Sequence, residues 1–261
     1  MSAYTSAFEL FSIGIGPSSS HTVGPMKAAL QFATRLESEG ILGRVTYVSC
    51  YLYGSLGATG IGHGTPDAVV AGLHGWDPET VDPDAVRRLW VDWPDGRELP
   101  LAASHTVRFQ KADISLEPRR RLPGHPNAMT LVARDVRDHV IAEDTYYSIG
   151  GGFIRREGEP ARVAAAPFPL AFDDAATLIE LCDEQGITIA EAARRNEEAL
   201  RSDEEIAAGL DRIWDAMAAC VNAGLEHDGV LPGILKVKRR AAVIRQQLEE
   251  IEAEGHRELP G

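Results

Sequence analysis

The sequence predicts an α+β fold in which a β-rich first part is followed by a helical second part. Up to about residue 155, short runs rich in β-branched and aromatic residues alternate with glycine-rich turns, which is typical of strands. Residues 155–171 contain three prolines and a run of alanines, as a linker would. After this linker, helix-capping pairs predict helices. We therefore expect a domain over 1–154, a linker over 155–171 and a helical segment over 172–261.

The bulk composition favours a globular protein with a small-molecule partner. Of its 261 residues, 44% are hydrophobic and 25% charged, and the formal net charge is −13. Nucleic acids and anionic membranes require clustered Lys and Arg, so neither is an expected partner. A signal-peptide pattern and an apolar run of about 20 residues are both missing from the sequence, so we expect a cytoplasmic protein. The three cysteines, Cys50, Cys182 and Cys220, are too far apart for a metal or redox pair and are expected to be buried thiols.

The elements of the first part follow from local patterns. A helix is expected from Thr22 or Val23, with Pro25 in its first turn, and a second one with Thr65 as N-cap and Pro66 at its first position. A strand is predicted over 44–56, and a short helix over 84–89 within a long loop. Further strands are predicted within 105–116, 127–135 and 139–157, with a hairpin turn over 134–138.

The second part carries clear helix-start signals. Asp173 or Asp174 is expected to cap a helix that continues through residue 181. Thr188 with Glu191 predicts a capping box in which each side chain satisfies a free backbone donor of the other residue, and the same spacing recurs at Ser202 and Glu205. A last, strongly charged helix is predicted over 234–254.

Two glycine-rich loops, GPSSSHTVGP (16–25) and GATGIGHGTP (57–66), each deliver a histidine to a helix start. The positive end of a helix dipole disfavours imidazolium, so His21 and His63 are expected to be neutral and able to act as general acid or base. The serine hydroxyls and the amides of a first helical turn can hold a carboxylate or phosphate. A serine-rich turn that merely caps a helix is the structural alternative. Neither loop ends in Gly-Lys-Ser/Thr, which argues against a Walker-type nucleotide site.

Five blocks of the sequence resemble a known enzyme family. They are FELFSIGIGPSSSHTVGPM, YGSLGATGIGHGTPDAVVAGL, HPNAM, YYSIGGGFI and GVLPGILKVKRRAA, in this order. Together they resemble the single-chain iron-sulfur L-serine dehydratases, also called L-serine ammonia-lyases. The resemblance implies an allosteric-substrate-binding-like α/β sandwich (a serine dehydratase beta-type domain) followed by the first helices of an all-α catalytic domain.

The resemblance also implies a function and a site. Members convert L-serine to pyruvate and ammonia with an oxygen-labile 4Fe-4S cluster as Lewis acid, in amino-acid catabolism that feeds gluconeogenesis, and are expected to be homodimers. His21 and His63 match the catalytic histidines, without a decision on which is the base. The implied substrate-binding positions are Ser18, Ser19, Ser20, Thr22, Gly62, Gly64, Thr65 and Asn127.

The sequence departs from this family in one respect. The cluster-binding cysteines of single-chain members lie beyond the LPGILKVKRRAA block, and none of the three cysteines here stands in such a context. We therefore expect a truncated chain, or one completed by a second chain, that is inactive alone and holds no metal. Its helical segment is expected to expose apolar surface and to self-associate.

Two alternatives differ in class. One is a non-catalytic, serine-binding regulatory module. The other, a pyridoxal-phosphate dehydratase, is disfavoured because none of the lysines, Lys27, Lys111, Lys236 and Lys238, follows a recognisable phosphate loop.

Overall fold

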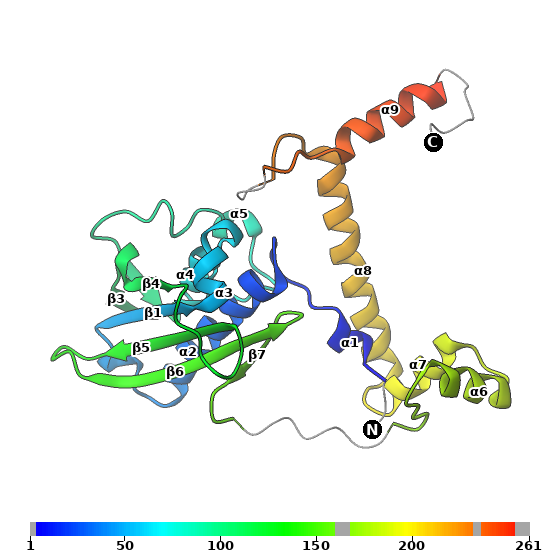
Figure 1. Cartoon of the computed structure of the whole chain (residues 1–261), viewed down its shortest axis with the longest axis horizontal. Helices are drawn as coiled ribbons and strands as arrows, with labels where there is room; N and C mark the ends of the chain where they lie inside the picture. Colours follow the sequence, from blue (N-terminus) through cyan, green and yellow to red (C-terminus); the bar gives the residue numbers. More distant parts are fainter. Residues whose placement is uncertain (1–3, 160–167, 232–235, 254–261) are drawn as a thin grey trace. The chain divides into compact units, whose positions relative to one another are not determined.

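The computed structural model of the protein (Figure 1) describes residues 4–159, 168–231 and 236–253. The chain forms two compact units, one of Ser12–Pro160 and one of Met1–Phe11 with Ala161–Gly261. An α+β unit followed by helices confirms the predicted fold class. The functional division into domains at 154 and 172 stays a prediction, and most of the predicted linker lies outside the described residues.

The first unit is built on one mixed sheet of seven strands in the order β2-β3-β1-β5-β6-β7, with β4 also paired to β1. β1 runs parallel to β3 and β4 and antiparallel to β5, so it lies at the centre. The strands are β1 Tyr47–Tyr53, β2 Glu98–Leu101, β3 His105–Arg108, β4 Ile114–Glu117, β5 Asn127–Arg134, β6 Val140–Gly150 and β7 Phe153–Arg156.

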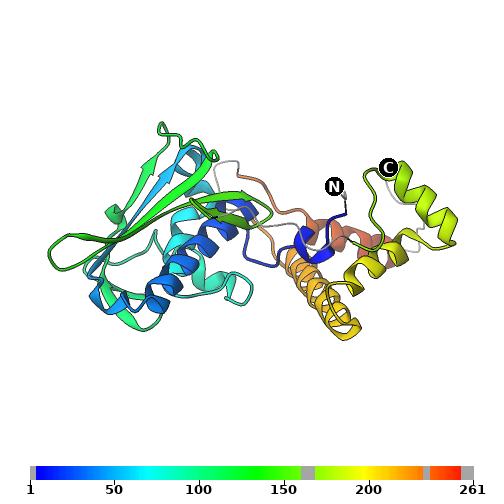
Figure 2. The ribbon, with the colours of Figure 1, turned by 90° about the horizontal axis from the view of Figure 1, so that it is seen from below.

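Helices α2 (Gly24–Ser38) and α4 (Thr65–Leu73) pack on each other and on one face of this sheet (Figure 2). Alternate residues of each strand point to this face, so Leu52 of β1 and Leu131 of β5 meet Phe32 of α2 in the core. Shorter elements surround them: a π-helical turn Ser19–Val23, α3 Gly54–Thr59, α5 Pro83–Val86, and 3₁₀ turns Leu42–Arg44, Ile61–His63 and Lys111–Asp113.

The second unit is helical, as predicted. Its helices are α1 Ala7–Leu10, α6 Ala175–Gln185, α7 Ile189–Glu198, α8 Asp203–Glu226 and α9 Ala241–Ala253. Asp174 caps α6, and the capping boxes at Thr188 and Ser202 are confirmed. In the described ranges, no helix combines the length and apolar character needed to cross a membrane.

Several local predictions are wrong. Thr65 is the first residue of α4 rather than its N-cap, because Gly64 adopts the left-handed conformation there and the Thr65 hydroxyl bonds elsewhere. The loop before residue 105 contains a strand, β2, which pairs with β3. The last helix begins at Ala241, because Val230 and Lys238 instead form an antiparallel bridge; residues 232–235 lie outside the described part.

The predicted exposure of apolar side chains in the second unit is confirmed. Trp214 and Val221 of α8 are 67% and 60% exposed, and Val243 of α9 is 51% exposed. Cys50 and Cys182 are buried, but the expected burial of Cys220 is wrong: it is exposed on α8. Self-association through this surface stays a prediction.

A buried histidine lies at the C-terminal end of α4. His74, the C-cap of this helix, is 8% exposed, and its ring stacks on Trp76 with centroids 4.8 Å apart. Its Nε2 atom has no hydrogen-bond partner among the described residues. Burial, and then the charge of Arg97, lower the pKa of His74 from its usual value. Protonation of this ring therefore opposes folding.

We expect the free energy of unfolding to fall as the pH is lowered through about 6.5, the ordinary histidine pKa. Below that pH the unfolded chain takes up a proton that folded His74 binds only at lower pH, so acid favours unfolding. Urea unfolding at pH 7.5 and 5.5 measures this loss, which should be smaller in His74→Gln. The stability of the variant should still depend on pH to some extent, because the pKa of His21 is also lowered. If His74→Gln lost as much unfolding free energy between pH 7.5 and 5.5 as the unchanged chain, His74 would not be the cause of the pH dependence.

Candidate functional site

The two predicted loops meet at one end of the sheet. In the first, Ser18 caps the π-helical turn, and its Oγ accepts a hydrogen bond from the His21 amide at 3.2 Å. In the second, a 3₁₀ turn ends at His63, and Gly64, with φ of 65°, turns the chain into α4. Glycine adopts this conformation without the penalty that a Cβ would impose. Both histidines therefore precede a helix that packs against the sheet.

Reciprocal hydrogen bonds lock the loops together. The Thr22 hydroxyl donates to the carbonyl oxygen of His63 at 2.8 Å, and the Thr65 hydroxyl donates to that of His21 at 2.5 Å. Both threonines are buried, with 2% and 0% exposure. Each threonine thus fixes the backbone of the histidine in the opposite loop.

We expect Thr22→Val and Thr65→Val each to lower the free energy of unfolding by about 1–3 kcal/mol, because each leaves a carbonyl without its donor. The double variant should lose less than the sum, since both bonds join the same loops. Urea unfolding of the double-mutant cycle tests this. Thr46→Val, which removes an exposed hydroxyl bonded to Arg134 O, is the control, with an expected change within about 0.5 kcal/mol. Strict additivity would contradict the reciprocal lock.

The two imidazole rings face each other, with centroids 4.8 Å apart and planes inclined by 40°. Both ring nitrogens of His21 meet hydroxyls: Nδ1 lies 3.0 Å from Ser20 Oγ, and Nε2 lies 3.0 Å from Ser55 Oγ. Burial, and then repulsion by His63, lower the pKa of His21, while a hydrogen bond at Ser55 acts in the opposite direction. A neutral His21 between two hydroxyls can pass a proton in either direction.

The hydrogen bond at His63 fixes its tautomer. Its Nδ1 lies 2.9 Å from the carbonyl oxygen of Thr59. Because a carbonyl oxygen only accepts, Nδ1 must carry the proton, and the neutral ring then has its lone pair on Nε2. The backbone carbonyl thereby orients His63 as a proton acceptor at Nε2.

Asn127 and Ser148 complete this end of the sheet. The Asn127 amide group donates to the Ser148 carbonyl oxygen at 3.4 Å, and Asn127 pairs with Gly54, next to Ser55. The Ser148 hydroxyl is buried without a partner among the described residues. It lies against Gly24, where a Cβ would come within 2.1 Å of it. A side chain at the start of α2 would therefore displace Ser148.

The structure brings most of the predicted site residues together. His21, His63, Thr22, Thr65 and Ser20 share the contacts described above, and Ser18 lies 3.5 Å from Ser20 through their hydroxyls. The positions of the others are less constrained: Ser19 is exposed, and a Cβ on Gly62 would meet no atom within 4 Å. Sequence reasoning missed Ser55 and Ser148. The only available signal for Ser55 was its place in the glycine-rich block after β1.

The α+β unit therefore carries a pair of facing histidines in two loops that also present hydroxyl groups. The sequence matches the serine dehydratase beta chain family over residues 6–159. The chain belongs to this family, which confirms the resemblance to L-serine dehydratases.

Named relatives agree with this membership. The chain is 44% identical to L-serine dehydratase of Streptomyces coelicolor over 253 residues, which cover 93% of this chain and 54% of the relative. It is 42% identical to L-serine dehydratase 1 of Escherichia coli over 248 residues, which cover 93% of this chain and 54% of that relative. It is 37% identical to L-serine dehydratase of Helicobacter pylori over 255 residues, which cover 94% of this chain and 54% of that relative. The chain thus spans about half the length of these relatives.

Proposed function

We propose that this chain is the part of an L-serine dehydratase that binds L-serine and moves its Cα proton. The observation that carries the proposal is the tautomer of His63. Its Nδ1–H is held by Thr59, so a lone pair remains on Nε2, in a loop locked to the one that holds His21 and three serines. The names of the relatives support L-serine as substrate.

The first loop is suited to the polar groups of an amino acid. The amides at the start of a helix and its positive dipole end favour a carboxylate. The hydroxyls of Ser18, Ser19 and Ser20 lie at this start. We propose that they hold the substrate carboxylate, with Thr22, Thr65 and Asn127 fixing the surrounding backbone and the glycines 62 and 64 giving access to His63.

Removal of the Cα proton by His63 Nε2 begins the reaction. The electron pair forms the Cα–Cβ double bond as the Cβ–O bond breaks, and the leaving hydroxyl takes a proton from His21 to become water. His63 then releases the Cα proton to solvent, and His21 regains a proton from there. The resulting enamine becomes an imine, and water hydrolyses it to pyruvate and ammonia. His21, between Ser20 and Ser55, is the group placed to pass a proton toward or away from the site.

The described residues do not fit the 4Fe-4S cluster of the enzymes that the sequence resembles. Cys50 lies in the core of the sheet, Cys182 is buried in α6 and Cys220 is exposed on α8. No group of three His, Cys, Asp or Glu side chains in the described part could hold a metal ion. We therefore place the cluster outside the described residues. The active enzyme is proposed to combine this chain with residues that correspond to the remaining half of its relatives.

We further propose that the active enzyme is a cytoplasmic homodimer that acts in serine catabolism. The three cysteines are free, as is usual in a reducing compartment. The exposed apolar side chains of α8 support association with further protein surface.

Calorimetric titration with L-serine separates catalysis from mere sensing. We expect saturable binding by this chain that is weakened at least tenfold when His21 and His63 are both replaced by glutamine, because the proposed substrate lies against both rings. His139→Gln, in an exposed turn, is the matched control. An affinity that survives the double replacement would favour a non-catalytic serine-binding module.

The chain alone is expected to be inactive. After anaerobic treatment with iron and sulfide, we expect neither a bound cluster nor pyruvate from L-serine, since the described residues lack a ligand set. Iron analysis and a pyruvate assay measure both. Turnover with about four irons per chain would show that the cluster site is present after all.

A further inference from the structure

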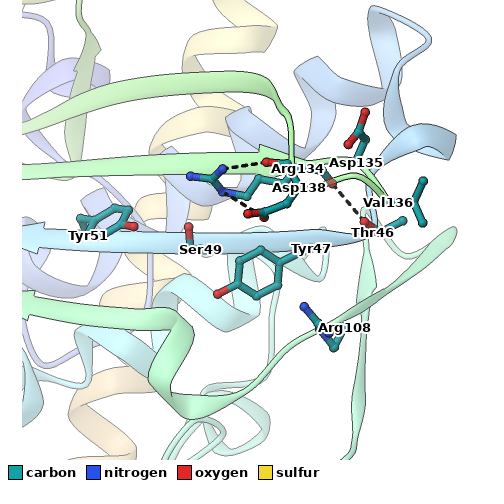
Figure 3. A pocket seen from close by; sticks show the side chains of 9 residues that line it. All are labelled: Thr46, Tyr47, Ser49, Tyr51, Arg108, Arg134, Asp135, Val136 and Asp138. Carbon is teal, nitrogen blue, oxygen red and sulfur yellow. Dashed lines mark hydrogen bonds and ion pairs between the residues drawn. The ribbon is translucent and has the colours of Figure 1, made fainter.

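A polar hollow lies on the sheet face opposite the helices. It encloses about 690 Å³ and is lined by the first half of β1, by Arg108 of β3, by Arg134 of β5 and by the β5–β6 turn (Figure 3). Strand alternation explains its character. Tyr47, Ser49 and Tyr51 point to this face, whereas the residues between them point into the core. His21 and His63 are not among its lining residues.

Ser49 is the group in this hollow that lacks a partner. Its side chain is only 6% exposed, and its hydroxyl has no hydrogen bond among the described residues. Across the sheet it faces Val132 of β5, which offers no polar side-chain atom. A buried hydroxyl without a partner costs free energy and calls for an explanation such as an absent ligand.

Two arginines that line the same hollow have N–H groups available to donate hydrogen bonds to a ligand. The Arg108 guanidinium lies over the Tyr47 ring, 5.4 Å from its centroid, and forms no ion pair with any described residue. Arg134 donates from Nη1 to the carbonyl oxygen of Asp138 at 3.0 Å, and its Nε lies 3.8 Å from the Asp138 carboxylate. The Asp138 side chain is 83% exposed, so water screens this pair.

The other acidic groups around the hollow have partners of their own. The Asp135 carboxylate accepts the amides of Arg137 and His139 at 2.8 and 3.0 Å within its own turn. The His139 amide, above all, holds the pKa of this carboxyl below its usual value. Figure 3 shows the Asp135 side chain directed away from Ser49. Asp113, which does not line the hollow, accepts a hydrogen bond from the Tyr47 hydroxyl at 2.6 Å.

We propose that this hollow binds a small oxyanion, a carboxylate or phosphate group, which takes charge-assisted hydrogen bonds from Arg134 and one from the Ser49 hydroxyl. Arg108, beyond the Tyr47 ring, adds positive charge at the rim of the hollow. Guanidinium groups match the geometry of both kinds of oxyanion. In Figure 3 the Arg134 guanidinium and the Ser49 hydroxyl lie on the same side of β1, between Tyr47 and Tyr51. The tyrosine rings bound the space that the body of the ligand occupies.

Calorimetry at constant ionic strength tests the proposal, with inorganic phosphate and malonate as separate probes. We expect one saturable site for at least one probe, and the tighter one identifies the ligand as a phosphate or a carboxylate compound. Arg134→Gln should weaken binding at least tenfold, Ser49→Ala several-fold, and Arg108→Gln less than Arg134→Gln, because Arg108 lies at the rim. Arg137→Gln, in the adjacent turn but outside the lining, should bind as the unchanged chain does.

Ser49→Ala supplies a second readout, because loss of an unpartnered buried hydroxyl should not lower thermal stability in the absence of ligand. A weaker binding constant together with unchanged or higher stability supports the site. Absence of saturable binding for both probes, or binding unchanged in the Arg108→Gln/Arg134→Gln double variant, overturns the proposal.

Discussion

Replacing His63 with glutamine is expected to lower kcat for L-serine dehydration by about a thousandfold in the active enzyme. A positioned general base contributes about 10²–10⁴ in rate. The glutamine amide can replace a hydrogen bond, but it cannot accept the Cα proton. The Thr59 carbonyl already fixes the histidine proton on Nδ1, so Nε2 is the only basic atom of the neutral ring.

The split between kcat and KM makes this prediction specific. A general base acts in the transition state, so kcat should fall while KM changes little. His139→Gln is the control, because its side chain is 69% exposed in the β5–β6 turn. If His63→Gln retains more than about a tenth of the wild-type kcat, His63 is not the base.

Gly72→Ala is expected to lower the free energy of unfolding by about 3 kcal/mol or more. A Cβ at this position of α4 would lie 2.3 Å from the carbonyl oxygen of Met26 and 2.8 Å from Cβ of Ala29, both in α2. The two helices would have to separate, and overpacking of this kind outweighs the roughly 1 kcal/mol that alanine gains over glycine as a helix former.

Urea unfolding measures this loss against Gly43→Ala, where a Cβ would meet no atom within 4 Å. The control should change stability by no more than about 0.5 kcal/mol. Because α2 and α4 begin at the two histidine loops, Gly72→Ala should also weaken the contact between those loops. Equal stability of the two variants would show that α2 and α4 do not pack this closely.

The sequence was informative wherever a local pattern decides the structure. Ser202 and Glu205, three residues apart, form a capping box because both partners belong to one turn. His21 and His63 were identified because each follows a glycine-rich loop before a helix. Their shared environment also follows from the fold, since α2 and α4 pack side by side on the sheet.

What the sequence could not predict depends on contacts across the fold. Thr65 resembled an N-cap, yet its hydroxyl bonds to His21, 44 residues away. Ser55 acquires its role from the ring of His21, and Ser148 from the backbone of Gly24. The sequence did not predict β2, because this strand is short and contains Pro100, which is unusual inside a strand. It forms by pairing with β3, a contact that a local pattern does not reveal.

The central claim, that the two locked loops hold L-serine against His21 and His63, is tested most directly by side-chain ¹⁵N NMR of the histidine rings during a titration with L-serine. We predict that His63 carries its proton on Nδ1 before serine is added. L-serine should then shift the ring nitrogens of His21 and His63 in a saturable manner and leave those of His139 unchanged. A proton on Nε2 of His63 in the free chain, or serine-dependent shifts that spare both rings, would contradict the account.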